Sequence, residues 1–199
     1  RVGSLLQDAA RASFTTLTDT RDAFINLAQR AKERFVVMSP YIDASGAAWA
    51  ADLFEQTPAV QRVLVLRGGE QLSQCGPAGV RLRSATTAIH DYAFETASPS
   101  GYVQLETFHA KIVLADGNVA YVGSANLLHR SRELNLECGF LLEGDAVAPV
   151  AVLVDAVLSM FVREGKRRPA TRVCFAALIA RDRCWDSLAV RHSAQRREE

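Results

Sequence analysis

Cysteines are few in this sequence, and none forms a Cys-x-x-Cys pair. The 199 residues contain four of them, Cys75, Cys138, Cys174 and Cys184. Structural zinc sites require four ligands at short, regular spacings, and Cys174, Cys184 and His192 do not meet that requirement. We therefore predict no metal site, and free thiols in a reducing compartment.

The sequence also lacks a strong net charge and a long apolar run. Its net charge is +1, so the overall electrostatics favour no partner. The most apolar stretch, residues 147–162, contains Pro149 and Asp155 and has helical periodicity, so we expect no membrane span and no membrane partner. Charge is concentrated at one end instead, because residues 163–199 contain ten Lys and Arg and five Asp and Glu.

Internal repeats and low-complexity segments are absent as well, and helical and strand-like apolar patterns alternate along the chain. Apolar spacing predicts helices over 20–34, 45–56 and 150–161, and strands over 35–38, 63–66, 80–83, 102–114, 119–123 and 136–142. This alternation predicts an α/β domain with a mixed sheet flanked by helices. We assign residues 1–165, with N-terminal helices, to that domain, and residues 166–199 to a basic, helical C-terminal segment.

One short segment combines several residues that suit phosphate chemistry. Residues 109–126 follow the pattern H-x-K, four residues, D, six residues, G-S-x-N. Side chains two positions apart on a strand share a face, so His109 and Lys111 are expected side by side. A turn at 116–118 would return the chain as a hairpin, so that the start and the end of the pattern meet.

These residue types can cleave a phosphodiester bond in two steps. A neutral imidazole such as that of His109 can attack phosphorus, and the phosphohistidine is then released to water. Lys111 and the amide of Asn126 can stabilise the charge on the phosphate oxygens. Ser124 can donate a further hydrogen bond, and Gly123 would allow close approach of the backbone. Such a mechanism needs no metal and no cofactor.

The pattern resembles the signature of the phospholipase D superfamily, whose members cleave phosphodiester bonds through a phosphohistidine. The resemblance extends over approximately residues 35–162 and implies a layered fold with a mixed sheet. It also implies that Glu137 orients His109 through the second ring nitrogen. Asp116 matches the Asp of the signature, and its place at the predicted turn favours a structural role. Leu128 departs from the family, in which many members carry Thr or Ser.

A single copy of the motif leaves the second acid or base unassigned. Hydrolysis needs a group that protonates the leaving oxygen and then activates water. The other histidines, His90, His129 and His192, lie in no second H-x-K. Single-motif members of the family are dimers, which implies a homodimer in which two copies of His109 face one shared site.

Several arginines and a lysine offer contacts to a polyanion. Arg130 and Arg132 either grip substrate phosphates or begin a solvated helix. Lys166, Arg167 and Arg168, in the basic C-terminal segment, either contact nucleic acid or form ordinary polar surface.

The resemblance leaves three functions open. Short bacterial members of the family include non-specific endonucleases and phospholipase-D-like proteins of antiphage defence systems such as DISARM. Residues 122–127, together with 135–137, resemble the defence-associated group. The alternatives are a phospholipase or phosphatidyltransferase, and a non-catalytic nucleic-acid-binding component of a defence complex. Because no membrane anchor is visible, we expect a homodimeric nuclease of the bacterial cytoplasm that acts on DNA, with other defence proteins as further partners.

Overall fold

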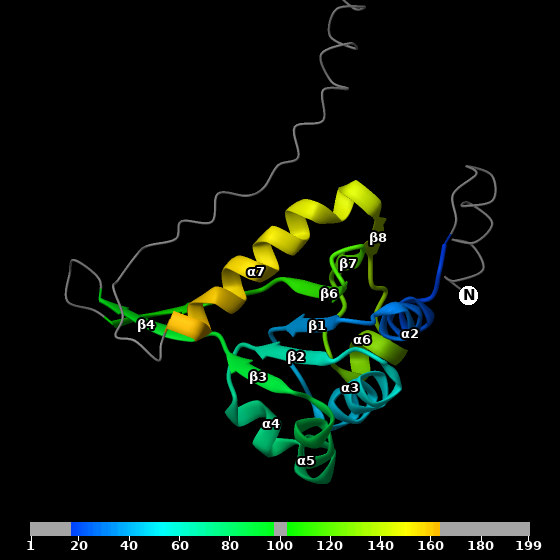
Figure 1. Ribbon diagram of the computed structural model, residues 1–199. Helices are drawn as coiled ribbons and strands as arrows, with labels where there is room; N and C mark the ends of the chain where they lie inside the picture. The colour runs from blue at the N-terminus through cyan, green and yellow to red at the C-terminus, as the bar shows by residue number, and fades with distance from the viewer. Residues whose placement is uncertain (1–16, 98–102, 164–199) are drawn as a thin grey trace, which may run out of the picture. The chain divides into compact units, whose positions relative to one another are not determined.

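The structure, a computed structural model, describes residues 17–97 and 103–163, which are built around a six-stranded mixed sheet (Figure 1). The strand order is β3-β2-β1-β6-β7-β8. The first three strands in sequence, β1 (Arg34–Ser39), β2 (Gln61–Leu66) and β3 (Ala88–Asp91), are parallel. The other three are added in antiparallel pairs, namely β6 (Lys111–Ala115), β7 (Val119–Gly123) and β8 (Gly139–Glu143).

Helices cover both faces of this sheet. On one face, α2 (Thr20–Arg30), α3 (Ala44–Gln56) and α5 (Gly76–Ala85) contribute to one buried core. On the other face, the short 3-10 helix η1 (Gly144–Val147) and α7 (Ala148–Arg163) contribute to a second core, and Figure 1 shows α7 on the side opposite α3. This arrangement confirms the predicted α/β fold, a mixed sheet flanked by helices.

Smaller elements connect the main ones. Helix α4 (Glu70–Gln74) precedes α5, and α6 (His129–Glu133) lies between β7 and β8. The strands β4 (Ala93–Ala97) and β5 (Val103–Thr107) form a separate two-stranded antiparallel sheet. The predicted C-terminal segment, residues 166–199, lies outside the described residues.

The segment formed by η1 and α7 departs from the prediction of no membrane span. By length and composition Gly144–Phe161 could cross a membrane, with a mean hydropathy of 1.7 and 17% of the segment buried. Val147, Val154 and Val157 are nevertheless buried in the core that includes side chains of the central strands. Each such burial stabilises the fold by about 1.5–3 kcal/mol.

The prediction of a strand over 80–83 is wrong, because these residues belong to α5. Pro77 lies in the first turn of this helix, where its missing N–H costs nothing. Leu82 is buried while Val80 is exposed, so the two apolar residues do not share a buried face as they would on a strand. The sequence predicts neither β3, which begins three residues after α5 ends, nor β4 (Ala93–Ala97).

The single strand predicted over 102–114 is interrupted. β5 ends at Thr107 and β6 begins at Lys111, so His109 lies in the connection between them. The prediction that His109 and Lys111 share one face of one strand is therefore wrong. The strand predicted over 136–142 begins only at Gly139, so Glu137 also lies in a connecting segment.

Asp116 joins the hairpin turn to the segment that follows α2. Its carboxylate accepts hydrogen bonds from the backbone N–H groups of Lys32, Glu33 and Arg34 at 2.7–2.9 Å. Its own φ is +54°, and the next residue, Gly117, has a φ of +79°. Helix α2 ends at Arg30, four residues before the predicted end. The N–H groups that bind the Asp116 carboxylate follow just after this helix.

Burial raises the pKa of Asp116, but the N–H donors of Arg34, Lys32 and Glu33 together lower it more, so the pKa lies below the ordinary 3.8. The folded state therefore favours the charged carboxylate. This stabilisation is fully present above the ordinary pKa and is lost as the pH falls through the lower folded-state value.

We predict that Asp116→Ala lowers the free energy of unfolding at pH 7 by about 2–3 kcal/mol, because three backbone donors lose their acceptor. In urea unfolding from pH 7 to pH 2.5, Asp116→Asn should differ from the wild type by a constant amount above pH 5 and by less below pH 3.8. The exposed Asp145→Asn is the control. A difference that does not depend on pH would contradict this account.

Candidate active site

Several of the predicted site residues lie at one edge of the six-stranded sheet, whereas Asp116 lies at the opposite end of the β6–β7 hairpin. β1, β2, β3 and β7 end at this edge, and the antiparallel strands β6 and β8 begin there. Lys111 pairs with Gly123 across β6 and β7, and Gly123 pairs with Gly139 across β7 and β8. The hairpin thus brings the start and the end of the motif together, and we call this edge the site edge.

His109 and Lys111 are in direct contact at the site edge. The Lys111 Nζ lies 2.8 Å from His109 Nδ1 and 3.2 Å from Nε2, and it donates to the backbone oxygen of His109 at 2.9 Å. Lys111 is only 6% exposed, whereas His109 is exposed. The two side chains therefore meet as predicted, although a loop and a strand bring them together rather than one continuous strand.

The environment of Lys111 weakens its hold on its proton. Burial lowers the pKa of the ammonium, and the negative charge of Glu137 opposes that effect without cancelling it. An ammonium with little water around it interacts more strongly with an anion placed beside it. Lys111 is thus well suited to bind a phosphate oxygen next to His109.

Ser124 and Glu137 form a second group. The Ser124 hydroxyl donates to Glu137 Oε2 at 2.5 Å and accepts from the Cys138 N–H at 3.0 Å, and Asn135 Nδ2 donates to Glu137 Oε1 at 3.5 Å. Among the hydrogen bonds of the described residues none joins Glu137 to His109. The proposed orientation of His109 by Glu137 therefore stays a prediction.

Gly123 is needed for the packing of Tyr121. A Cβ atom at Gly123 would lie 2.3 Å from the Tyr121 hydroxyl, and one at Gly139 would lie 2.4 Å from the Tyr121 ring. The phenol oxygen accepts a hydrogen bond from the Ala125 N–H at 3.3 Å. The glycine of the motif thus leaves room for a side chain that holds the backbone before Asn126.

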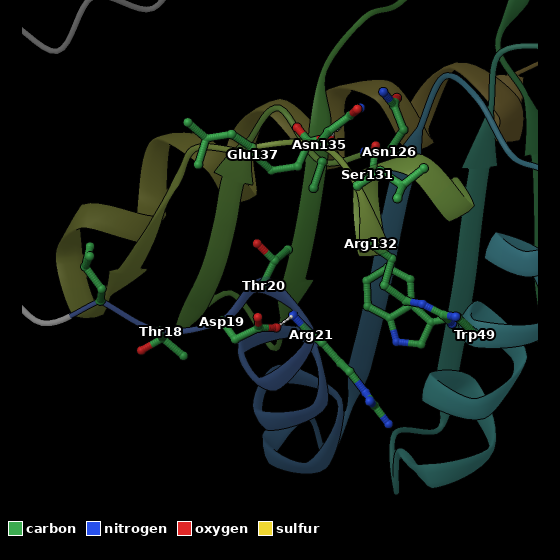
Figure 2. A pocket seen from close by; sticks show the side chains of 14 residues that line it. Thr18, Asp19, Thr20, Arg21, Trp49, Asn126, Ser131, Arg132, Asn135 and Glu137 are labelled. Carbon is green, nitrogen blue, oxygen red and sulfur yellow. Dashed lines mark hydrogen bonds between the residues drawn. The ribbon is translucent and has the colours of Figure 1, made fainter. Parts of the chain in front are cut away.

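Asn126 lies at a cavity of about 440 Å³, shown in Figure 2. Its backbone N–H donates to the Ser131 Oγ at 3.2 Å, while its Oδ1 is buried without a hydrogen-bond partner. Glu137 lines the same cavity, together with Trp49 of α3 and residues at the start of α2. The structure thus brings Asn126 and Glu137 to one cavity, whose lining does not include His109 or Lys111.

The loop that carries Asn126 is fixed against the start of α3. The Asp43 carboxylate accepts from the Gly46 N–H at 2.7 Å, which caps α3, and from the His129 N–H at 2.9 Å. The Asp43 N–H donates to the Leu127 oxygen at 3.1 Å. A Cβ atom at Gly46 would lie 1.7 Å from that oxygen, so this contact requires glycine.

The predicted phosphate-contacting residues are only partly described. Arg130 is exposed on α6, and Arg132 lines the cavity while its Nε donates to Glu133 Oε1 at 2.7 Å. The remaining three, Lys166, Arg167 and Arg168, lie outside the described residues. Within residues 17–97 and 103–163, no three His, Cys, Asp or Glu side chains gather closely enough to hold a metal ion.

Comparison with known families places the chain in one of them. The sequence model of the family described as "Cardiolipin synthase, PLD-like domain" matches residues 24–155, which include all strands of the central sheet. The chain belongs to the phospholipase D-like family. It is accordingly a phosphodiesterase of the phospholipase D superfamily.

The chain is also similar to solved structures. "NucT from Helicobacter pylori" is 13% identical, with a TM-score of 0.52, over 71% of this chain and 86% of that protein. Nuc from Salmonella typhimurium, described as a phospholipase D family member, is 14% identical with a TM-score of 0.44, over 74% of this chain and 88% of that protein. No curated protein sequence matches the chain.

Ser39 and Tyr41, to which the sequence analysis gives no role, lie beside the candidate site. Ser39 is buried at the end of β1, donates to the Tyr41 oxygen at 2.8 Å and accepts from the Leu127 N–H at 3.1 Å. The rings of Tyr41 and His109 meet edge to face, with centroids 6.0 Å apart. The sequence Ser39-Pro40-Tyr41 after a buried strand predicts a turn, but it does not predict these contacts.

We predict that Glu137→Gln lowers the pKa of Lys111 further, because it removes the negative charge that opposes the effect of burial. The chain has three lysines, Lys32, Lys111 and Lys166, so NMR of ¹³C-labelled lysine can follow each ammonium separately. Glu133→Gln on α6 is the matched control and should leave the Lys111 titration in place. An unchanged Lys111 titration in Glu137→Gln would show that the two charges do not interact.

Proposed function

We propose that this phosphodiesterase is a metal-independent nuclease that cleaves nucleic acid, DNA in the first place, through a covalent phosphohistidine on His109. The contact between the Lys111 ammonium and the His109 imidazole carries this proposal. It supplies a nucleophile and a partly desolvated cation at one point of the surface, which a two-step attack on a phosphodiester requires.

The reaction would proceed by two displacements at phosphorus. In the first, a ring nitrogen of His109 bonds to phosphorus, the bond to the leaving oxygen breaks, and that oxygen takes a proton from a general acid. In the second, water attacks phosphorus, the bond to His109 breaks, and a general base takes a proton from the water. Lys111 would stabilise the negative charge on the non-bridging oxygens, assisted by Ser124 and Asn126.

The general acid and base would come from a second copy of the chain. The sequence holds one H-x-K, so a homodimer would place His109 of the partner subunit across one shared site. An exposed apolar surface next to the site supports this arrangement. It includes Leu134, Leu136 and Phe140, which are 67–71% exposed on both sides of Glu137.

Because of the same apolar surface, a lipid is the second candidate substrate. Exposed leucines and a phenylalanine beside a phosphodiesterase site could also contact acyl chains at a membrane surface. Basic residues near the site, such as exposed Arg130, favour a polyanion instead. We therefore place nucleic acid first.

A role in bacterial antiphage defence is part of this proposal. It is supported by the likeness of residues 122–127, together with 135–137, to the defence-associated proteins of the family. Such a role implies action in the cytoplasm, with other defence proteins as partners.

We predict that the wild-type protein cuts labelled DNA or RNA in the presence of EDTA, and that His109→Ala lowers the rate by a factor of about 10³ or more. Single- and double-stranded forms of both polymers and a phosphatidylglycerol vesicle are compared in parallel. Cleavage of the lipid alone would favour the second candidate. Binding of nucleic acid without cleavage would identify a non-catalytic component.

We predict that Phe140→Asp converts a dimer to a monomer of 21.7 kDa and lowers the cleavage rate by about 10²–10⁴-fold, because the second histidine is lost. Light scattering and the cleavage assay measure the two effects. Val60→Asp is the matched control, since Val60 is 71% exposed on the loop before β2. A fully active monomer would contradict the shared site.

A further inference from the structure

Two side chains outside the motif lie beside His109 at the site edge. Tyr41 follows β1 by two residues and Arg67 follows β2 directly, and both of these parallel strands end at this edge. Arg67 Nη1 donates to the Tyr41 hydroxyl at 2.7 Å, and its guanidinium carbon lies 5.6 Å from the centre of the Tyr41 ring. The Tyr41 ring in turn meets the His109 ring edge to face at 6.0 Å. Arg67, Tyr41 and His109 thus form one continuous row.

Arg67 lacks the carboxylate partner that four other arginines of the described residues have. Arg30, Arg34, Arg81 and Arg132 each form an ion pair with a carboxylate. No ion pair within the described ranges includes Arg67. The nearby Asp91, which pairs with Leu66 in the sheet, accepts a hydrogen bond from the Gly69 N–H at 2.7 Å instead. The positive charge of Arg67 is therefore not neutralised by a direct carboxylate contact.

Arg67 and Tyr41 together retain free hydrogen-bond donors that can bind a phosphate. A guanidinium has five N–H donors, and the bond to Tyr41 uses one of them. The Tyr41 hydroxyl accepts from Arg67, so its own hydrogen can still be donated. A planar guanidinium with free donors matches two oxygens of a phosphate.

The loop that carries Tyr41 is held in place before any ligand binds. Ser39 Oγ donates to the Tyr41 oxygen at 2.8 Å. Gln71 Nε2 donates to the Pro40 oxygen at 3.2 Å, and Gln71 Oε1 accepts from the Ile42 N–H at 3.3 Å. The guanidinium near the Tyr41 ring also gains a cation–π contact. Little conformational freedom would be lost when the pair binds an anion, which favours affinity.

The geometry points to a second phosphate subsite, in which Arg67 and Tyr41 bind a phosphate adjacent to the scissile one in a nucleic-acid strand. This inference rests on the proposed nuclease function. A nucleic-acid strand whose scissile phosphate lies at His109 carries a further phosphate next to it, whereas a phosphatidylglycerol molecule offers a single phosphodiester. The pair would thus favour polymeric substrates and fix the direction in which the strand lies along the site edge.

The test combines a protein change with a substrate change. Arg67→Gln and the wild type are assayed on short oligonucleotides with one cleavable site, in which the phosphate on either side is replaced in turn by an uncharged methylphosphonate. In the wild type one of the two replacements should lower kcat/KM by about tenfold. In Arg67→Gln that replacement should cost almost nothing further, and the salt dependence on the unmodified strand should fall by about 0.7 in slope.

Arg83→Gln removes the same charge from the exposed end of α5, just before the amino end of β3 and hence away from the site edge. It should respond to both replacements as the wild type does. Tyr41→Phe, which retains the ring but loses the hydroxyl, should show a smaller loss at the same phosphate. Thermal unfolding of each variant establishes that the fold is kept.

The outcomes separate this inference from the function on which it rests. Wild-type cleavage of the oligonucleotides with equal losses in wild type and Arg67→Gln would overturn the subsite and leave the nuclease function standing. Absence of nucleic-acid cleavage by the wild type, with cleavage of the lipid, would overturn both.

Discussion

The pairing of β6 with β7 places Lys111 opposite Gly123, and the rest of the candidate site depends on that register. It places the buried ammonium of Lys111 at the site edge, in contact with His109 of the preceding loop. Ser124, which follows β7, donates a hydrogen bond to Glu137. A shift of the register by one residue would turn Lys111 to the opposite face. The geometry of the site therefore depends on the stability of the β6–β7 hairpin.

The motif serves the fold as much as the chemistry. Its Asp116 lies at the far end of the hairpin, where it binds three backbone N–H groups of the chain before β1. Its Gly123 leaves room for Tyr121, whose hydroxyl holds Ala125, the residue before Asn126. Two of the six fixed positions thus maintain the geometry in which the other residues can act, and His109 and Lys111 remain as the pair in direct contact.

The sequence predicts the parts of this structure that rest on local patterns. The strands at 35–38 and 63–66 and the hairpin follow from apolar runs and a turn, and each is present. The strand at 80–83 is wrong because an amphipathic helix and a strand can both show short alternation. The row of Arg67, Tyr41 and His109 could not be predicted, since Arg67 and Tyr41 are 26 residues apart and meet only because parallel strands end together.

The measurement that tests the central claim most directly is capture of the covalent intermediate. The protein is mixed with a nucleic-acid substrate labelled at the scissile phosphate, quenched in alkali within milliseconds to seconds, and digested for mass spectrometry. Our account predicts label on His109 in a linkage that is stable in alkali and lost in acid. Product formation at the full rate without protein-bound label, or label on another residue, would contradict it.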